Sequence, residues 1–193
     1  MPGYGQQCKH DSVILYRKDK FGTPRQDLID KYGDMLDFNN DSVCLFTSRN
    51  YLIISAHLKS NKKHLEQAVE MFKALREVRA QHPFIKIIIG MDANHLIHHE
   101  NLLNEEGKQI FFLTPSVPER VTTIKKRSHM QAQFKKAGLE VSEVKDHIVS
   151  SNPINEEEVW IETIDGSESR GELLPNDRHP YDHYIVHAKL RCL

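Results

Sequence analysis

The feature that most constrains the fold is one long amphipathic helix pattern set between two apolar strand patterns. In residues 63–80, apolar side chains recur at helical spacing, and lysine, glutamate and arginine fill the other face. His82-Pro83 ends this pattern. Residues 51–57 and 84–89 are rich in β-branched and aromatic side chains, which is typical of strands. A strand, a helix and a strand in this order predict an α/β crossover unit, in which the helix covers one face of a sheet.

The other segments extend this sheet. Residues 43–47 are a further β-rich run, and Ser48-Arg49-Asn50 between this run and residues 51–57 predicts a hairpin of two largely buried strands. The apolar run at residues 13–16 predicts a strand that ends in a solvated turn. Weaker patterns predict a helix at 102–108, a helical turn at 131–137, loops at 114–123 and 165–176, and strands at 144–149, 159–164 and 184–190.

Composition and charge narrow the class of protein. The chain has 193 residues, 39% hydrophobic and 27% charged, which is the composition of one soluble globular domain over residues 1–193. No apolar run approaches the roughly 20 residues that cross a bilayer, and no signal peptide begins the chain, so we expect an intracellular protein, cytoplasmic or nuclear. Three distant cysteines, Cys8, Cys44 and Cys192, fit neither a disulfide framework nor a zinc site. The net charge of −1 counts against a strong basic field but leaves room for a local basic patch.

Polar residues occupy the points where apolar strands begin or end. Strand ends that meet on one rim of a sheet can bring residues distant in sequence within hydrogen-bond reach. Singly, most of them have a structural explanation: a half-buried strand histidine, or a turn built from Asp and Asn. A carboxylate inside an apolar strand is harder to explain without a partner. The set comprises His57, Asp92, Asn94, Asp146, Asp182 and His183.

Together these residue types suit the hydrolysis of phosphodiesters. Mg²⁺ prefers oxygen ligands and keeps several waters, so one or two carboxylates suffice to hold it. A second carboxylate can deprotonate the attacking water, an amide can donate to a phosphate oxygen, and a histidine held by an aspartate can stabilise developing charge. A competing hypothesis is a transition-metal site at His95, His98, His99 and Glu100, with a solvated polar face as its alternative; the HExxH pattern of a zinc protease is absent.

Four motifs, in this order, resemble the endonuclease/exonuclease/phosphatase superfamily, which includes DNase I, apurinic endonucleases, deadenylases and inositol polyphosphate 5-phosphatases. The resemblance covers roughly residues 11–190. It implies a DNase I-like sandwich of two mixed β-sheets with outer helices, and a hydrolase that depends on Mg²⁺, with Mn²⁺ as an alternative. The motifs are Ser55-Ala56-His57-Leu58, Gly90-Met91-Asp92-Ala93-Asn94, Lys145-Asp146-His147-Ile148 and Pro180-Tyr181-Asp182-His183.

The resemblance implies a catalytic role for each of five residues. Asp92 would position the attacking water, and Asn94 would contact the scissile phosphate. His183 would be the catalytic histidine, with Asp146 as the carboxylate that supports it. His57 would contact the phosphate.

The resemblance also implies the metal ligands and the substrate. Asp182 would serve the metal together with Asp92. Lys126 and Arg127 stand in a basic segment that either holds substrate phosphate or forms a solvated face. Nucleic acid or a nucleotide is the expected substrate, and inositol and lipid phosphates remain open.

This sequence departs from the family pattern in three places. His147 replaces an aromatic residue, and Tyr181 stands where serine is usual. The family also begins with one strand carrying an Asn and another carrying a metal-binding Glu, and nothing before Val13 supplies either. We therefore expect the C-terminal two thirds of the family fold, truncated at the N-terminus, with strand edges open to a partner or to self-association. Two hypotheses follow: a metal-dependent phosphoesterase with weakened metal binding, and a non-catalytic scaffold that binds phosphate or nucleic acid.

Overall fold

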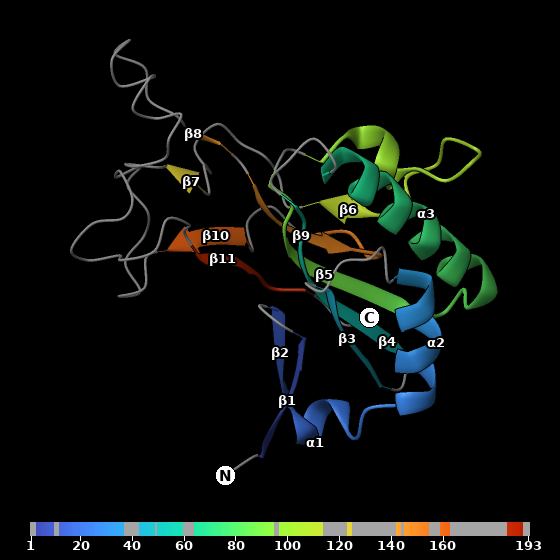
Figure 1. Cartoon of the computed structure of the whole chain (residues 1–193), viewed down its shortest axis with the longest axis vertical. Helices are drawn as coiled ribbons and strands as arrows, with labels where there is room; N and C mark the ends of the chain where they lie inside the picture. Colours follow the sequence, from blue (N-terminus) through green and yellow to red (C-terminus); the bar gives the residue numbers. More distant parts are fainter. Residues whose placement is uncertain are drawn as a thin grey trace.

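The structure, a computed structural model of the chain, describes residues 3–9, 12–36, 43–48, 50–59, 64–94, 97–113, 123–124, 142–143, 145–154, 159–162 and 185–190. Its centre is a five-stranded mixed sheet with the strand order β3-β4-β5-β9-β6 (Figure 1). These strands are β3 (Val43–Ser48), β4 (Tyr51–His57), β5 (Lys86–Asp92), β9 (Asp146–Ser150) and β6 (Phe112–Leu113).

The other described elements are short sheets and helices. The two-stranded sheets pair β1 (Tyr4–Lys9) with β2 (Ser12–Arg17), β7 (Thr123–Ile124) with β8 (Ser142–Glu143), and β10 (Val159–Glu162) with β11 (Ile185–Ala188). The helices are α1 (Lys18–Phe21), α2 (Gln26–Leu36), α3 (His64–Gln81) and the 3-10 turn η1 (His99–Leu102). In the part of the chain that the structure describes, no helix is long and apolar enough to cross a membrane.

The predicted crossover unit is confirmed. Strands β4 and β5 pair in parallel, and α3 connects them. Phe72 and Leu75 of α3 are fully buried in one core with Ile54 of β4 and Ile87 of β5. Since burying a side chain of this size contributes about 1.5–3 kcal/mol, this contact is what holds α3 against the sheet.

The predicted hairpin of two buried strands is also confirmed. Strands β3 and β4 are antiparallel, with Ser48 paired to Tyr51. All six residues of β3 are buried, although β3 is an edge strand of the central sheet. The reason is that α2 packs against β3 and the β1–β2 hairpin contacts it as well. The backbone N–H of Arg25, just before α2, also donates to Thr47 O of β3 at 2.8 Å.

The sequence patterns described above do not include two N-terminal elements, β1 and α2. Strand β1 is polar and pairs with β2, the strand that the apolar run predicts. Here the Tyr16 ring lies directly over Gly5, a position where any Cβ would overlap it. Helix α2 buries Tyr32 and Leu36, and Leu28, Ile29 and Met35 pack against the same core, so its apolar residues recur at helical spacing although the patterns above do not include it. The charged residues after β2 form the one-turn helix α1.

The predicted helix at residues 102–108 is wrong. The helical turn is η1, which ends at Leu102, and a turn follows. The side-chain oxygen of Asn104 accepts hydrogen bonds from the backbone N–H groups of Glu106, at 3.1 Å, and Lys108, at 2.8 Å. Gly107 adopts a left-handed φ of 73°. Because Asn104 bonds the local backbone and Gly107 reverses the chain, a helix does not form here.

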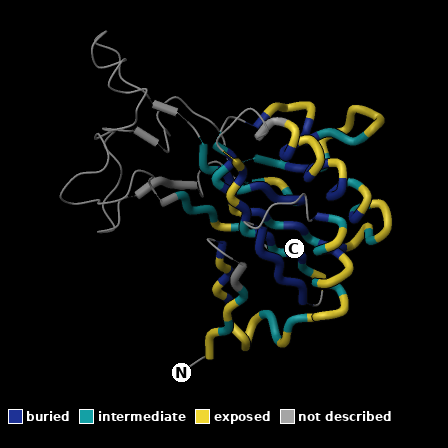
Figure 2. Tube along the Cα trace, viewed as in Figure 1, coloured by how far each residue is buried: buried dark blue, intermediate teal, exposed yellow. Residues whose placement is uncertain are grey.

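The two faces of the central sheet carry different layers. Figure 1 shows α2 and α3 on one side and the β1–β2 and β10–β11 pairs on the other. On the second side, Ile14 and Tyr16 of β2 form a buried cluster with Cys44 and Phe46 of β3, and β11 contacts β9. Figure 2 shows the burial concentrated in the central sheet, while Leu15 on the outer face of the hairpin is 68% exposed. The strands predicted at 144–149, 159–164 and 184–190 correspond to β9, β10 and β11.

Candidate active site

Three of the predicted site residues lie side by side at one edge of the central sheet. His57, the last residue of β4, is in register with Asp92, the last residue of β5. Asp92 is in turn in register with Asp146, the first residue of β9. Parallel β4 and β5 end at the same edge, and antiparallel β9 begins there, so strand pairing alone brings residues 57, 92 and 146 together. We call His57, Asp92 and Asp146 the polar row.

The polar row lies on the face of the sheet opposite to α3. Side chains alternate along a strand, and Ala56 and Met91 belong to the core under α3. His57 and Asp92 therefore point to the other side, where the side chains are 46% and 21% exposed. The row is accessible to a solute from that side.

Close contacts hold the ends of β4 and β5 together. His57 Nε2 lies 3.7 Å from Asp92 Oδ2, an ion pair when the imidazole is protonated. Leu58 N–H donates to Asp92 O at 2.8 Å, and Ala93 N–H donates to Lys145 O at 2.8 Å. These two backbone bonds continue the sheet one residue past the polar row, which keeps its three side chains on a rigid frame.

Asn94 is a brace between the same two strand ends. Its backbone N–H donates to Asp92 Oδ1 at 2.8 Å, and its Nδ2 donates to Leu58 O at 2.7 Å. Its φ is 55°, and it is the one described non-glycine residue with a positive φ. Asparagine tolerates this left-handed conformation better than most residues. An amide Nδ2 carries two N–H donors, so the bond to Leu58 O uses only one of them.

An open hollow of about 360 Å³ lies over the polar row. Its lining includes all three residues of the row, and also Ser12, Ser55 and Gly90. Ser55 and Gly90 stand within two of the four motifs, but the resemblance assigns no role to them or to Ser12. Ser55 and Gly90 could have been found by alternation, because they stand two residues before His57 and Asp92 on the same face.

The donor set of the polar row fits a hard cation. Asp92 and Asp146 offer carboxylate oxygens, which Mg²⁺ and Mn²⁺ prefer. Among the described residues, no group of three or more His, Cys, Asp and Glu side chains forms a complete metal site. The predicted residues Asp182, His183, Lys126 and Arg127 lie outside the described residues.

The described members of the alternative histidine cluster are exposed and form no metal site. His98, His99 and Glu100 lie at η1 on the surface. Within the described ranges they are not part of any group that could hold a metal ion. His95 lies outside the described residues.

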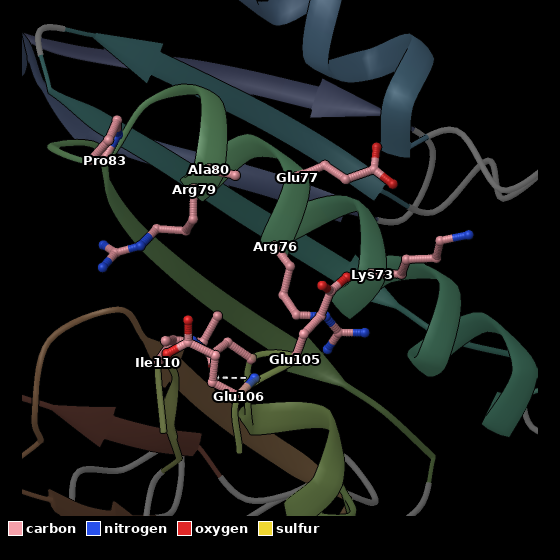
Figure 3. Close-up of a pocket in the computed structure, with 10 residues that line it drawn as sticks. Lys73, Arg76, Glu77, Arg79, Ala80, Pro83, Glu105, Glu106 and Ile110 are labelled. Atoms are coloured by element: carbon pink, nitrogen blue, oxygen red, sulfur yellow. Dashed lines mark hydrogen bonds between the residues drawn. The ribbon is translucent and has the colours of Figure 1, made fainter. Parts of the chain in front are cut away.

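A second hollow, of about 650 Å³, lies on the helix side, between α3 and the turn at residues 103–110. Figure 3 shows Arg76 and Arg79 of α3 on one side of it and Glu105 and Ile110 on the other. The guanidinium of Arg76 donates to the backbone carbonyls of η1 and the next residue, at 3.3 and 3.4 Å. Arg79 donates to Ile85 O at 3.1 Å, and burial lowers the pKa of Arg79. These two arginines connect α3 to its neighbours.

Comparisons with known proteins find a match in structure only. No protein-family model matches the chain, and no curated protein matches its sequence. A mannosyl-6-phosphatase from Bacteroides thetaiotaomicron matches over 98% of this chain and 77% of its own, with a TM-score of 0.51 and 15% identity. ANGEL2, a 2′,3′-cyclic phosphatase, matches over 97% of this chain and 73% of its own, with a TM-score of 0.46 and 13% identity.

Matches to TDP2 are partial. Truncated TDP2 from Caenorhabditis elegans matches over 75% of this chain, with a TM-score of 0.43 and 16% identity. The chain spans about half the length of three C. elegans TDP2 structures, namely 56%, 44% and 43%. The fold is assigned from the match to the mannosyl-6-phosphatase, which extends over nearly the whole chain. The predicted α/β, DNase I-like fold is confirmed.

Proposed function

We propose that residues 1–193 form one phosphoesterase domain that depends on Mg²⁺ or Mn²⁺ and hydrolyses phosphate esters of a nucleic acid or nucleotide. The observation that carries this proposal is the polar row. Two carboxylates and an imidazole from three separate strands stand in register at an accessible sheet edge, beside Asn94, whose backbone N–H donates to Asp92. Such a set supplies a base, a donor and oxygen ligands for a cation in one place.

The proposed reaction gives Asp92 two roles, as base and as metal ligand, and gives each other group one. Asp92 accepts the proton of a water whose oxygen attacks phosphorus, the ester P–O bond opposite breaks, and the leaving oxygen takes up a proton from solvent water. His57 and the second N–H of Asn94 donate to non-bridging oxygens, on which negative charge grows. Asp146 supports His183 by a hydrogen bond.

The metal and the substrate's other phosphates complete the proposal. Asp182 and Asp92 hold the cation, which supplies Lewis-acid stabilisation of the phosphate oxygens when bound. Lys126 and Arg127 contact further phosphates of the substrate. We expect the protein to act in the cytoplasm or nucleus.

The test is hydrolysis of bis(p-nitrophenyl) phosphate by the whole chain. Because general-base catalysis is typically worth about 10²–10⁴-fold, we expect kcat/KM to fall by about that factor in Asp92→Asn. Asp34→Asn, on the exposed face of α2, is the matched control and should keep full activity. EDTA should abolish the hydrolysis, and added Mg²⁺ or Mn²⁺ should restore it.

Two outcomes would count against the proposal. Hydrolysis that survives both Asp92→Asn and EDTA would belong to another site or another protein. A folded wild type with no hydrolysis in Mg²⁺ or Mn²⁺ would favour the second hypothesis, a non-catalytic surface that binds phosphate or nucleic acid. Fluorescence anisotropy with a labelled oligonucleotide would then test binding, with Asp34→Asn again as control.

A further inference from the structure

A second row of residues crosses the same three strands directly inside the polar row. Ser55 of β4, Gly90 of β5 and Ile148 of β9 are paired in register. Two residues along a strand span about 7 Å, and neighbouring strands lie about 4.8 Å apart. Ser55 and Gly90 line the same open hollow as the polar row. The hollow therefore continues from the polar row to the surface of two small residues. We call the part of the hollow over Ser55 and Gly90 the recess.

Gly90 adds no side chain to the surface of this hollow. A Cβ at residue 90 would meet no described atom within 4 Å, and the residue is exposed in the middle of a sheet. Its backbone does not require glycine, since the described glycines with positive φ are Gly22 and Gly107. A glycine in a strand costs about 0.5–1 kcal/mol relative to alanine, and it often marks a bulge, a bend, or the close approach of a ligand or another backbone. Among the described residues, neither a turn nor packing accounts for this glycine, whereas the open space above it does.

Two serines border this recess, whereas the β9 neighbour of Gly90 is the apolar Ile148. Ser55 flanks Gly90 on β4, and Ser12 of β2 lines the hollow from the second layer. A serine hydroxyl both donates and accepts a hydrogen bond, as the hydroxyls of a sugar do. A flat strand backbone without a side chain can receive the C–H face of a sugar ring. The recess thus offers a small, hydroxyl-lined space about one residue pair away from the proposed phosphate position.

We propose that this recess binds the sugar ring of a phosphorylated sugar or nucleotide, and that Gly90 sets the specificity for it. The inference rests on the proposed function and names the substrate class of the same site. The phosphate lies at the polar row, and the ring lies over Gly90 with a hydroxyl on Ser55. A side chain at position 90 fills this space and excludes the ring.

The experiment compares two diesters with the same leaving group. Thymidine 5′-(p-nitrophenyl phosphate) carries a sugar, and bis(p-nitrophenyl) phosphate does not. In Gly90→Val, we expect the ratio of kcat/KM for the sugar diester to that for the aryl diester to fall by about tenfold or more, which is typical of a steric change in a pocket. Ser55→Ala should lower the same ratio less. Gly33→Ala, in α2, is the control and should leave the ratio unchanged, because its Cβ makes only an ordinary contact.

Each result decides the inference separately from the proposed function. If the wild type hydrolyses both diesters and the ratio does not change in Gly90→Val, the recess does not bind the sugar ring, and the proposed phosphoesterase function still stands. A large loss of thermal stability in Gly90→Val, absent in Gly33→Ala, also overturns sugar binding in the recess, since protein would then fill the space.

If the wild type hydrolyses neither diester, NMR titration decides. Thymidine 5′-monophosphate and glucose 6-phosphate should then shift the Ser55 and Gly90 amides in the wild type but not in Gly90→Val, and an unshifted wild type overturns the recess. A response to only one of the two shows whether the sugar comes from a nucleotide or a free sugar phosphate.

Discussion

Asn94 contributes to stability through a side-chain hydrogen bond and by tolerating a left-handed backbone, and two substitutions measure these contributions separately. Its side chain donates to Leu58 O at 2.7 Å, and its backbone has a left-handed φ of 55°. Asn94→Gly removes the hydrogen bond but suits the left-handed backbone. Asn94→Ala removes the bond and places a Cβ in a conformation that alanine avoids. We therefore expect the stability order wild type, then Asn94→Gly, then Asn94→Ala.

The magnitudes follow from the two contributions. A part-buried hydrogen bond between an amide and a carbonyl is worth about 1 kcal/mol, so Asn94→Gly should lose about that much. The left-handed conformation costs an L-residue roughly 1 kcal/mol more, so Asn94→Ala should lose about 2 kcal/mol. For a chain of this size, 1 kcal/mol shifts the unfolding midpoint by about 2–4 °C. The expected falls are about 2–4 °C for glycine and about 4–8 °C for alanine.

The assay is thermal unfolding of the whole chain at pH 7, followed by circular dichroism. Gly107→Ala is the matched control, because Gly107 has a φ of 73° and open space around it. That variant measures the cost of a left-handed Cβ alone, and we expect it to match the difference between the two Asn94 variants. An Asn94→Ala protein as stable as Asn94→Gly would refute the reasoning, since the left-handed backbone would then carry no cost.

Three further predictions concern the scaffold. Burial raises the pKa of Tyr32. The contribution of Tyr32 to stability is therefore complete below the ordinary tyrosine pKa near 10 and is lost as the pH rises above that value. Tyr32→Phe should make the loss of stability at alkaline pH less steep, as measured by circular dichroism. Arg76→Met removes the hydrogen bonds from α3 to η1 and should cost about 1 kcal/mol in urea unfolding; an unchanged midpoint would mean that these bonds are not stabilising. Gly5→Ala places a Cβ against the Tyr16 ring and should cost about 1–3 kcal/mol by thermal unfolding, whereas Gly3→Ala makes only an ordinary contact with the Lys18 side chain and should be neutral.

The part of the fold that the sequence predicts is the part with long, regular patterns. Residues 51–57 and 84–89 are strongly β-branched, and the helix between them repeats its apolar residues over several turns. Tertiary packing agrees with these local preferences, so β4, α3 and β5 form as expected. Because β-strands end where their apolar runs end, the sequence pattern also predicts that His57 and Asp92 share one edge of the sheet.

Other elements depend on contacts that no local pattern contains. Strand β1 is polar and exists because β2 pairs with it and Tyr16 covers Gly5. Helix α2 is different, because its apolar residues recur at helical spacing and the sequence could have predicted it; packing against β3 stabilises this helix of 11 residues. The roles of His183, Asp182, Lys126 and Arg127 stay predictions, since these residues lie outside the described part of the chain.

Strand pairing positions the polar row, and this determines which substitutions in the site change stability and which change only activity. His57, Asp92 and Asp146 are placed by strand pairing, in which backbone hydrogen bonds and the core under α3 supply the order. Their side chains are partly exposed and add little packing, so replacing His57 or Asp146 should remove chemistry without unfolding the sheet. Asn94 differs, because its side chain and backbone brace the strand ends to each other. A substitution at Asn94 should therefore lower activity and stability together, whereas one at His57 should lower activity alone.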